Sequence, residues 1–270
     1  MLKSKIDKAT GFEKRFENID TVVFEDSVSA SKAVAQEIAA LIKVKQSQKQ
    51  PCVLGLATGS SPKSLYAELV RLHKEEGLSF KNVITFNLDE YYPMDPNSVN
   101  SYVRFMKELL LDKVDILKEN YHIPDGTLSK EEIAQYCLDY EAKIEAVGGL
   151  DIQILGIGGN GHIGFNESGS LQNSKTRLVA LDHITRVAAS KDFSGLGNTP
   201  RTAITLGIKK IMEAKRVILM AWGEGKSDVI RTSVEGEVTN QVPASFLQEH
   251  HNAVFILDKE ASSKLTRIHT

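Results

Sequence analysis

The 270-residue chain is poor in cysteine and has no apolar run that approaches the length of a membrane span. Its two cysteines, Cys52 and Cys137, are too few for a disulfide framework and lack the spacing of a zinc site. Residues 1–18 are charged and polar and lack the apolar core of a signal peptide. We therefore expect a protein of a reducing compartment, the cytoplasm, with no membrane partner.

An excess of charge of one sign is also lacking. The sequence has 33 Lys and Arg residues against 35 Asp and Glu residues, a net charge of −2. Nucleic acids and anionic membranes attract clustered positive charge, so we expect neither as a partner. We expect a small-molecule partner instead, and an anionic one must be captured by local groups. A homo-oligomer is compatible with the sequence, which does not fix the oligomeric state.

Internal repeats and low-complexity linkers are missing, and short apolar runs alternate with amphipathic stretches, as in parallel α/β proteins. The sequence predicts strands at 21–24, 52–57, 83–88, 151–155, 216–222 and 253–257, helices at 28–46, 62–73, 101–112 and 130–146, and a polar loop at 91–100. The predicted fold class is α/β: a single-domain, open, mostly parallel, Rossmann-like sheet with helices on both faces. Residues 1–18 are predicted to be a mobile extension, and residues 19–270 the domain.

Four predicted strand ends carry unusual residues, and ligands of open parallel sheets bind beyond such ends. The first end reads Thr58, Gly59, Ser60 and Ser61, followed by Pro62. Ser61 can cap the next helix and Pro62 suits its first turn. The free backbone N–H groups of that helix start could then hold a phosphate. Plain helix capping explains the same residues equally well.

A pair of carboxylates, Asp89 and Glu90, directly follows the predicted strand 83–88. At least one should point into the crevice, where burial can raise its pKa toward that of a general base at working pH. The alternative is a solvated acidic turn, but no turn residue separates the pair from the apolar strand. The sequence therefore favours a catalytic carboxylate.

The glycine-rich segment 154–167 forms the third strand end and presents Asn160, His162, Asn166 and Glu167. A histidine between an amide and a carboxylate can be held in one tautomer and used for proton transfer. The alternative is a structural turn with a satisfied histidine, which this segment alone leaves open.

The same segment also spells a dinucleotide fingerprint, with Gly156, Gly158 and Gly161 followed by Asp182 about 20 residues on. That fingerprint must open a helix. Residues 161–176 are rich in Gly, Asn and Ser, which disfavour helix. We therefore expect no nucleotide cofactor.

Lys226 marks the fourth strand end, in a glycine-rich segment at a predicted helix start. A P-loop is excluded because Met220 stands where its first glycine would fall. Lys226 is well placed for a phosphate, although a solvated surface lysine is the alternative. The adjacent His250 and His251 have no third ligand at metal spacing, so we expect no metal. Together the four ends suit proton transfer on a small phosphorylated sugar.

Three motifs, Leu56–Pro62, Phe86–Tyr91 and Gly158–Glu167, resemble those of the glucosamine-6-phosphate deaminases (isomerases). The resemblance runs in register from about residue 20 to residue 265 and implies a cofactor-free enzyme of amino-sugar metabolism and N-acetylglucosamine catabolism. Its implied reaction converts glucosamine 6-phosphate and water to fructose 6-phosphate and ammonia. The implied class label is hydrolase, with isomerase chemistry through an enediol-like intermediate.

The resemblance also implies roles for the site residues. Asp89 is similar to the base that moves the C2 proton to C1. His162 is similar to the acid/base that opens the sugar ring, oriented by Glu167 and Asn160. Phosphate binding is implied for Thr58, Gly59, Ser60, Ser61, Lys226 and Lys191; the last stands where the family often has an arginine.

The sequence departs from the family pattern at Ser168, usually proline, and at Tyr92-Pro93, usually small residues. Arg177 matches a position of the allosteric site in regulated members, but Val179 replaces a lysine there, so we do not expect activation by N-acetylglucosamine 6-phosphate. In some relatives such a domain precedes a deacetylase-like domain and has lost catalytic residues. Asp89, His162 and Glu167 are all present here, which favours a working enzyme.

Two alternative functions remain. A 6-phosphogluconolactonase-like hydrolase would share the fold and the phosphate cradle, although its pattern differs at Asp89–Tyr91 and Phe165–Glu167. A non-catalytic sugar-phosphate sensor would bind glucosamine 6-phosphate without releasing ammonia.

Overall fold

A seven-stranded, wholly parallel sheet forms the centre of the computed structural model, which describes residues 12–269. In spatial order its strands are β2 (Asp20–Phe24), β11 (Ala253–Asp258), β10 (Val217–Ala221), β7 (Ile152–Leu155), β3 (Cys52–Leu56), β4 (Val83–Asn87) and β6 (Tyr121–His122). The central strands are buried along their whole length, so apolar side chains occupy both faces.

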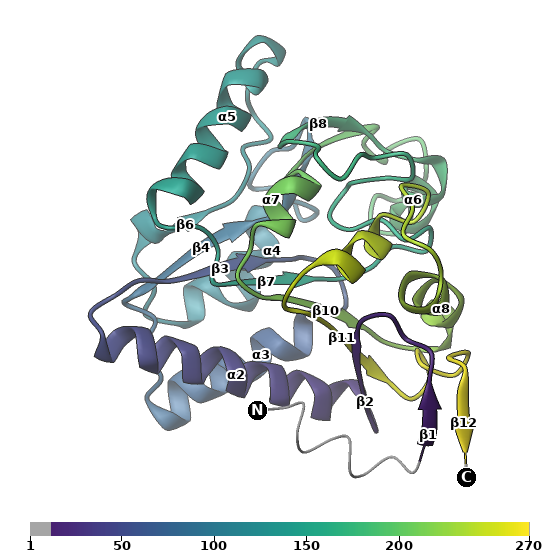
Figure 1. The fold of residues 1–270 in the computed structure, drawn as a ribbon. Coiled ribbons are helices and arrows are strands. Elements are labelled where there is room, and N and C mark those ends of the chain that lie inside the picture. Colours follow the sequence, from purple (N-terminus) through teal and green to yellow (C-terminus); the bar gives the residue numbers. More distant parts are fainter. Residues whose placement is uncertain (1–11, 270) are drawn as a thin grey trace.

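Helices cover both faces of this sheet: α2 and α3 lie on one side and α5 and α7 on the other (Figure 1). The helices are α2 (Ser27–Ser47), α3 (Lys63–Glu76), α4 (Tyr102–Leu109), α5 (Lys130–Ala146), α6 (His183–Ala189), α7 (Ile208–Met212) and α8 (Ser227–Glu235), with 3-10 turns η1 (Leu111–Lys113), η2 (Lys118–Asn120), η3 (Glu224–Lys226) and η4 (Pro243–Glu249). Within residues 12–269, none of the helices combines the length and apolarity that crossing a membrane requires.

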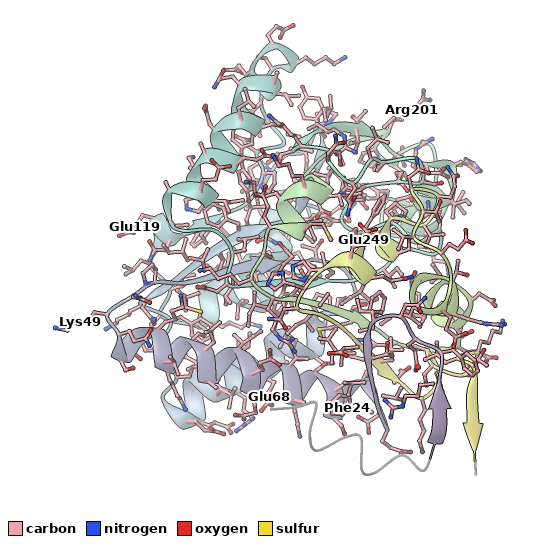
Figure 2. The ribbon with its side chains drawn as sticks, viewed as in Figure 1. Phe24, Lys49, Glu68, Glu119, Arg201 and Glu249 are labelled. Atoms are coloured by element: carbon pink, nitrogen blue, oxygen red, sulfur yellow. The ribbon has the colours of Figure 1, made fainter. Side chains whose placement is uncertain are left out.

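Local sequence fixes several helix ends. The Asp26 carboxylate accepts the Ser29 N–H and starts α2, and Ser129 and Glu132 form a capping box at the start of α5. Gly77 ends α3 in the left-handed conformation, with φ of 70°. In Figure 2 the side chain of Lys49, just beyond α2, points away from the molecule, as does that of Arg201.

Two small antiparallel sheets complete the fold. One pairs β1 (Phe12–Arg15) with β12 (Arg267–His269), and the other has the order β5 (Asp89–Tyr92), β9 (Thr202–Thr205), β8 (Arg177–Ala180).

The predicted α/β class with helices on both faces is confirmed. All six predicted strands are present, and α5 has the predicted bounds. The predicted loop at 91–100 was wrong at its start, because Tyr91 and Tyr92 belong to β5, which pairs with a segment more than a hundred residues away. Of the predicted mobile extension, residues 1–11 lie outside the described residues, and Phe12–Arg15 form β1.

A buried carboxylate ties together the amino ends of β3 and β7, opposite the end where a ligand is expected. Asp151 accepts hydrogen bonds from the Nζ atoms of Lys45 and Lys215, both at 2.8 Å, and from the Val53 N–H at 2.9 Å. Burial raises the pKa of Asp151, but these hydrogen bonds outweigh it and leave the pKa below its usual value.

We predict that Asp151→Asn lowers the free energy of unfolding at pH 7 by about 1–3 kcal/mol, the range for lost charged hydrogen bonds. A carboxyl group whose pKa is depressed on folding stabilises above its unfolded pKa and loses this contribution as pH falls. Urea unfolding should therefore show the deficit shrinking below about pH 4. Lys215→Met is the control, since that side chain is 58% exposed and should cost under about 1 kcal/mol. Equal costs for both variants would contradict a central role for Asp151.

Candidate active site

A pocket of about 370 Å³ lies at the carboxyl ends of β3, β4, β7 and β10, which are neighbours in the sheet. After β3 the chain moves outward to β4 and β6, then returns to β7 on the other side of β3. The pocket thus sits at the topological switch point, where open α/β sheets bind ligands. Its volume suits a small molecule. The walls come from residues 57–61, 88, 89, 91, 156–159, 162, 164, 165, 184, 185, 188 and 189, with Tyr102 and Lys226. Of the predicted catalytic residues, Asp89 and His162 are among these described wall residues, and Asn160 and Glu167 are not.

The loop Thr58–Ser61 forms one wall, as predicted, and leads into α3. Gly59 has φ of 92°, a conformation that favours glycine and lets the loop turn toward the pocket. The predicted cap was wrong in detail. Pro62 is the N-cap of α3, and no described side chain caps this helix. The four residues therefore face the pocket at a helix start whose first N–H groups lack a side-chain cap.

Asp89 lines the pocket at the start of β5, and its side chain is almost wholly buried, with 6% of the residue exposed. Burial raises the pKa of Asp89 to about 7. Gly164 allows the loop to pack against this region, because a Cβ at Gly164 would lie 2.9 Å from Thr205 Oγ1 and 3.4 Å from Asp89 Oδ2. A carboxylate with such a pKa can accept a proton near neutral pH.

Glu90, the other member of the carboxylate pair, points away from the pocket into the start of α4. Its carboxylate accepts hydrogen bonds from the N–H groups of Tyr91, Tyr102 and Val103, at 2.8–3.2 Å. Burial nevertheless raises the pKa of Glu90 to about 8. Glu90 thus holds α4 in place, which brings Tyr102 to the pocket.

His162 is held by a carboxylate and a hydroxyl on one edge of its ring. His162 Nδ1 lies 3.2 Å from Glu167 Oε2 and 3.3 Å from Thr185 Oγ1. Asn160 Nδ2 donates to Glu167 Oε2 at 2.9 Å, and Asn160 Oδ1 accepts the backbone N–H of His162 at 3.3 Å, so Asn160 holds both residues. These contacts leave Nε2 as the ring nitrogen that is turned away from Glu167.

The environment of Glu167 keeps this carboxylate ionised. Burial raises the pKa of Glu167, but the hydrogen bonds and charge of His162, with Asn160 and Thr185, outweigh it and bring the pKa to about 2. An ionised Glu167 favours a proton on Nδ1 of His162 and fixes the ring orientation. Asp89, which lines the pocket, thus titrates near neutrality, while Glu167, which contacts the pocket residue His162, stays charged. Such a division is typical of acid/base sites.

Asn166, which the sequence grouped with the site, is an anchor of the glycine-rich loop and is fully buried. Its amide donates to the carbonyl oxygens of Ile163 and Leu206 and accepts from the Arg177 guanidinium at 2.9 Å. The Arg177 guanidinium also donates to Ser170 Oγ, so Arg177 stabilises the glycine-rich loop through two hydrogen bonds. Residues 161–176 contain no helix in the structure, as the sequence predicted.

The two lysines predicted at the phosphate site are placed differently. Lys226 lines the pocket and donates to the carbonyl oxygen of Ile157 at 2.7 Å, and burial lowers its pKa. Lys191 is exposed, and among residues 12–269 those that line the pocket do not include it. The physical reason is that Lys191 lies beyond the end of α6, whose residues Ala188 and Ala189 reach the pocket instead.

Several pocket residues were not predicted, among them Thr185, Ile184, Tyr91 and Tyr102. Tyr91 follows Asp89 closely in sequence, so its place could have been inferred. Nothing in the sequence marks Thr185, because its contact with His162 depends on how α6 docks. Among residues 12–269, no three His, Cys, Asp or Glu side chains are placed to share a metal ion.

Comparison with known proteins gives a family match over residues 25–256, to the model described as glucosamine-6-phosphate isomerases/6-phosphogluconolactonase. A putative glucosamine-6-phosphate deaminase-like protein of Bacteroides thetaiotaomicron is 49% identical over 261 residues, which cover 95% of this chain and 39% of that protein. The chain thus spans well under half the length of this relative. A glucosamine-6-phosphate deaminase of Bacillus pumilus is 41% identical over 91% of this chain and 99% of its own length.

The solved structures that share the fold include two that differ in activity. A monomeric glucosamine-6-phosphate deaminase superposes with a TM-score of 0.86 at 37% identity, over 91% of this chain and 99% of that chain. A 6-phosphogluconolactonase from Trypanosoma brucei superposes with a TM-score of 0.75 at 22% identity, over 93% of this chain and 100% of that chain. The second likeness concerns the fold alone.

Gly158 should be required for the position of the His162 ring, because a Cβ at Gly158 would lie 2.2–2.4 Å from three ring atoms. We predict that Gly158→Ala displaces the ring from Glu167 and shifts the imidazole nitrogen signals of His162 in NMR spectra, assigned with His162→Gln. Gly159→Ala is the matched control, since no described heavy atom lies within 4 Å of a Cβ there. Unchanged His162 signals in Gly158→Ala would show that the His162 ring does not pack against Gly158.

Proposed function

The chain belongs to the family of glucosamine-6-phosphate isomerases and 6-phosphogluconolactonases, and we propose that it converts glucosamine 6-phosphate and water to fructose 6-phosphate and ammonia. Relatives named glucosamine-6-phosphate deaminase support this choice, because they align over almost their full length. The deaminase structure with the TM-score of 0.86 supports it as well.

One observation carries the proposal: a buried carboxyl group of raised pKa, an oriented histidine and an anion cradle line the same pocket. Asp89 supplies the first and His162, fixed by Glu167, the second. The loop Thr58–Ser61 supplies the anion cradle, and Lys226 adds a cation to the same pocket. This set matches a substrate that needs its ring opened, one carbon-bound proton moved and one phosphate held.

Ring opening comes first. His162 transfers the proton of the C1 hydroxyl to the ring oxygen as the bond between C1 and that oxygen breaks, which gives the open-chain aldehyde. Glu167 stabilises the charged imidazole during this transfer, and Asn160 and Thr185 hold Glu167 and the ring in place.

Proton transfer between carbons follows. Asp89 removes the C2 proton while a proton of the substrate's ammonium group passes to the C1 oxygen, which leaves an enediol-like species with hydroxyl on C1 and amine on C2. The same carboxyl group returns its proton to C1, so that C2 becomes a protonated imine. Water adds to C2 and ammonia leaves, which yields the ketose phosphate. No other reactant is required.

The class label expected from the resemblance needs correction. The comparisons do not support the label hydrolase, because the family is described by its glucosamine-6-phosphate isomerases. The step that defines the reaction is the proton transfer from C2 to C1, and water enters only after it.

The alternative activity is lactone hydrolysis, which the fold of the Trypanosoma brucei enzyme permits. A coupled ammonia assay with glucosamine 6-phosphate, beside a hydrolysis assay with 6-phosphogluconolactone, separates the two. We expect ammonia release and no lactone hydrolysis. Tight binding of glucosamine 6-phosphate without ammonia release would indicate a sugar-phosphate sensor instead.

Asp89→Asn should abolish most turnover, with kcat lowered by about 10²–10⁴-fold, as for a lost general base. Substrate affinity should change by only a few-fold, since Asn fills the same volume. Deuterium exchange at C2 in D₂O measures the step directly, and exchange at the wild-type rate in the variant would refute the assignment.

Because burial raises the pKa of Asp89 to about 7, wild-type kcat/KM should fall as pH drops below about 7, where the base becomes protonated.

Lys226→Ala should raise KM for glucosamine 6-phosphate about ten- to hundredfold, the usual effect of one lost charge-assisted contact. Lys191→Ala is the matched control: it removes the same charge from a residue outside the pocket wall and should change KM by less than about threefold. The kcat/KM for unphosphorylated glucosamine should be very low in all three proteins. An equal loss for both substrates in Lys226→Ala would mean that Lys226 does not bind the phosphate.

A further inference from the structure

Trp222 is the only tryptophan of the chain and lies one residue beyond the end of β10. Its indole Nε1–H donates a hydrogen bond of 2.9 Å to the carbonyl oxygen of Ser61, the last residue of the anion cradle. In the sheet β7 stands between β10 and β3. The bond therefore reaches across a strand and ties one wall of the pocket to another.

The orientation of the Ser61 carbonyl determines the conformation of the cradle where it joins α3. Pro62 follows Ser61, and its carbonyl accepts the first hydrogen bond of α3, from the Tyr66 N–H at 2.9 Å. The Ser61 carbonyl thus lies just ahead of the helix, and Pro62 has no N–H of its own. By holding this oxygen, the indole fixes the Ser61–Pro62 peptide plane and with it the end of the loop that faces the ligand.

The turn that carries Trp222 also carries Lys226, which lines the pocket and bonds the Ile157 carbonyl. Gly223 anchors this turn: its N–H lies 3.0 Å from both carboxylate oxygens of Asp258, at the end of β11, and its φ is 83°. The turn 222–226 is thus fixed to β11 at Gly223. Its first residue, Trp222, holds the cradle, and its last, Lys226, places a cation at the pocket.

We propose that Trp222 is a positioning residue, which sets the cradle Thr58–Ser61 at the right distance from Lys226 to bind a phosphate group. It acts through Ser61, because Trp222 is not one of the described residues that line the pocket, whereas Ser61 is. That the phosphate belongs to an amino sugar rests on the proposed function. The geometry of the indole and the cradle does not depend on it.

The first test uses the wild-type protein, with inorganic phosphate as the probe. All tryptophan emission comes from Trp222, so a phosphate bound in the cradle should change that emission along a saturable curve. A chloride titration at the same ionic strength should leave the emission unchanged. A flat response to phosphate, or the same response to chloride, would overturn the proposal.

The second test uses Trp222→Phe, which keeps an aromatic ring and removes the N–H donor. We expect a KM for glucosamine 6-phosphate raised about three- to tenfold, the effect of one neutral hydrogen bond, with kcat within about twofold. Calorimetry should show the affinity for inorganic phosphate reduced by a similar factor. The low kcat/KM for unphosphorylated glucosamine should be unchanged, since that substrate does not use the cradle.

A loss of kcat at unchanged KM, or equal losses for both substrates, would overturn the positioning role. If neither protein releases ammonia, the proposed function fails, and calorimetry with phosphate still decides the role of Trp222. If Trp222→Phe fails to fold, the emission of the wild-type protein decides it.

Discussion

The hydrogen bonds of one residue, Leu88, join the two sheets on which the pocket depends. Leu88 lies between the end of β4 and the start of β5. Its N–H donates to the carbonyl of Leu56, at the end of β3, at 3.0 Å, and its carbonyl accepts the Leu206 N–H, just beyond β9, at 2.7 Å. The chain therefore leaves one sheet and enters the other at a single residue. The next residue is Asp89, which is why a carboxylate can be almost fully buried at the mouth of a parallel sheet.

The small sheet then links this carboxylate to the glycine-rich loop. Asp89 pairs with Thr205 across β5 and β9, and Thr205 pairs in turn with Arg177 on β8. The Thr205 hydroxyl accepts the Phe165 N–H at 3.0 Å, and Arg177 holds Asn166. Two pocket segments far apart in sequence are thus held by one row of paired residues, and the rings of Tyr91 and Phe165, 5.1 Å apart, pack between them.

The sequence was informative wherever the signal was local. Apolar runs predicted the parallel strands, and the polar residues just beyond them predicted the pocket, because carboxyl ends of parallel strands must meet at one edge. The small sheet could not be predicted in this way: Asp89–Tyr92 reads as the start of a polar loop, and its strand character comes from pairing with Thr202–Thr205. The same limit applies to Thr185, whose contact with His162 exists only after α6 docks. Lys191, which the family resemblance assigned to phosphate binding, is exposed and is not among the described residues that line the pocket.

The carboxyl groups of Asp89, in the pocket wall, and Glu167, next to His162, show that the surroundings of a carboxyl group, rather than its residue type, set its pKa. Both Asp89 and Glu167 are largely removed from water, and burial alone would raise both pKa values. Glu167 has His162, Asn160 and Thr185 around it, and these hold its charge, whereas burial dominates at Asp89. A partner for Asp89 as strong as His162 would keep it permanently ionised and make it a weak base. The proposed proton transfer therefore requires that the small sheet bury Asp89 without supplying it a cation. Glycine at position 164 allows the loop to approach Thr205 of this sheet closely.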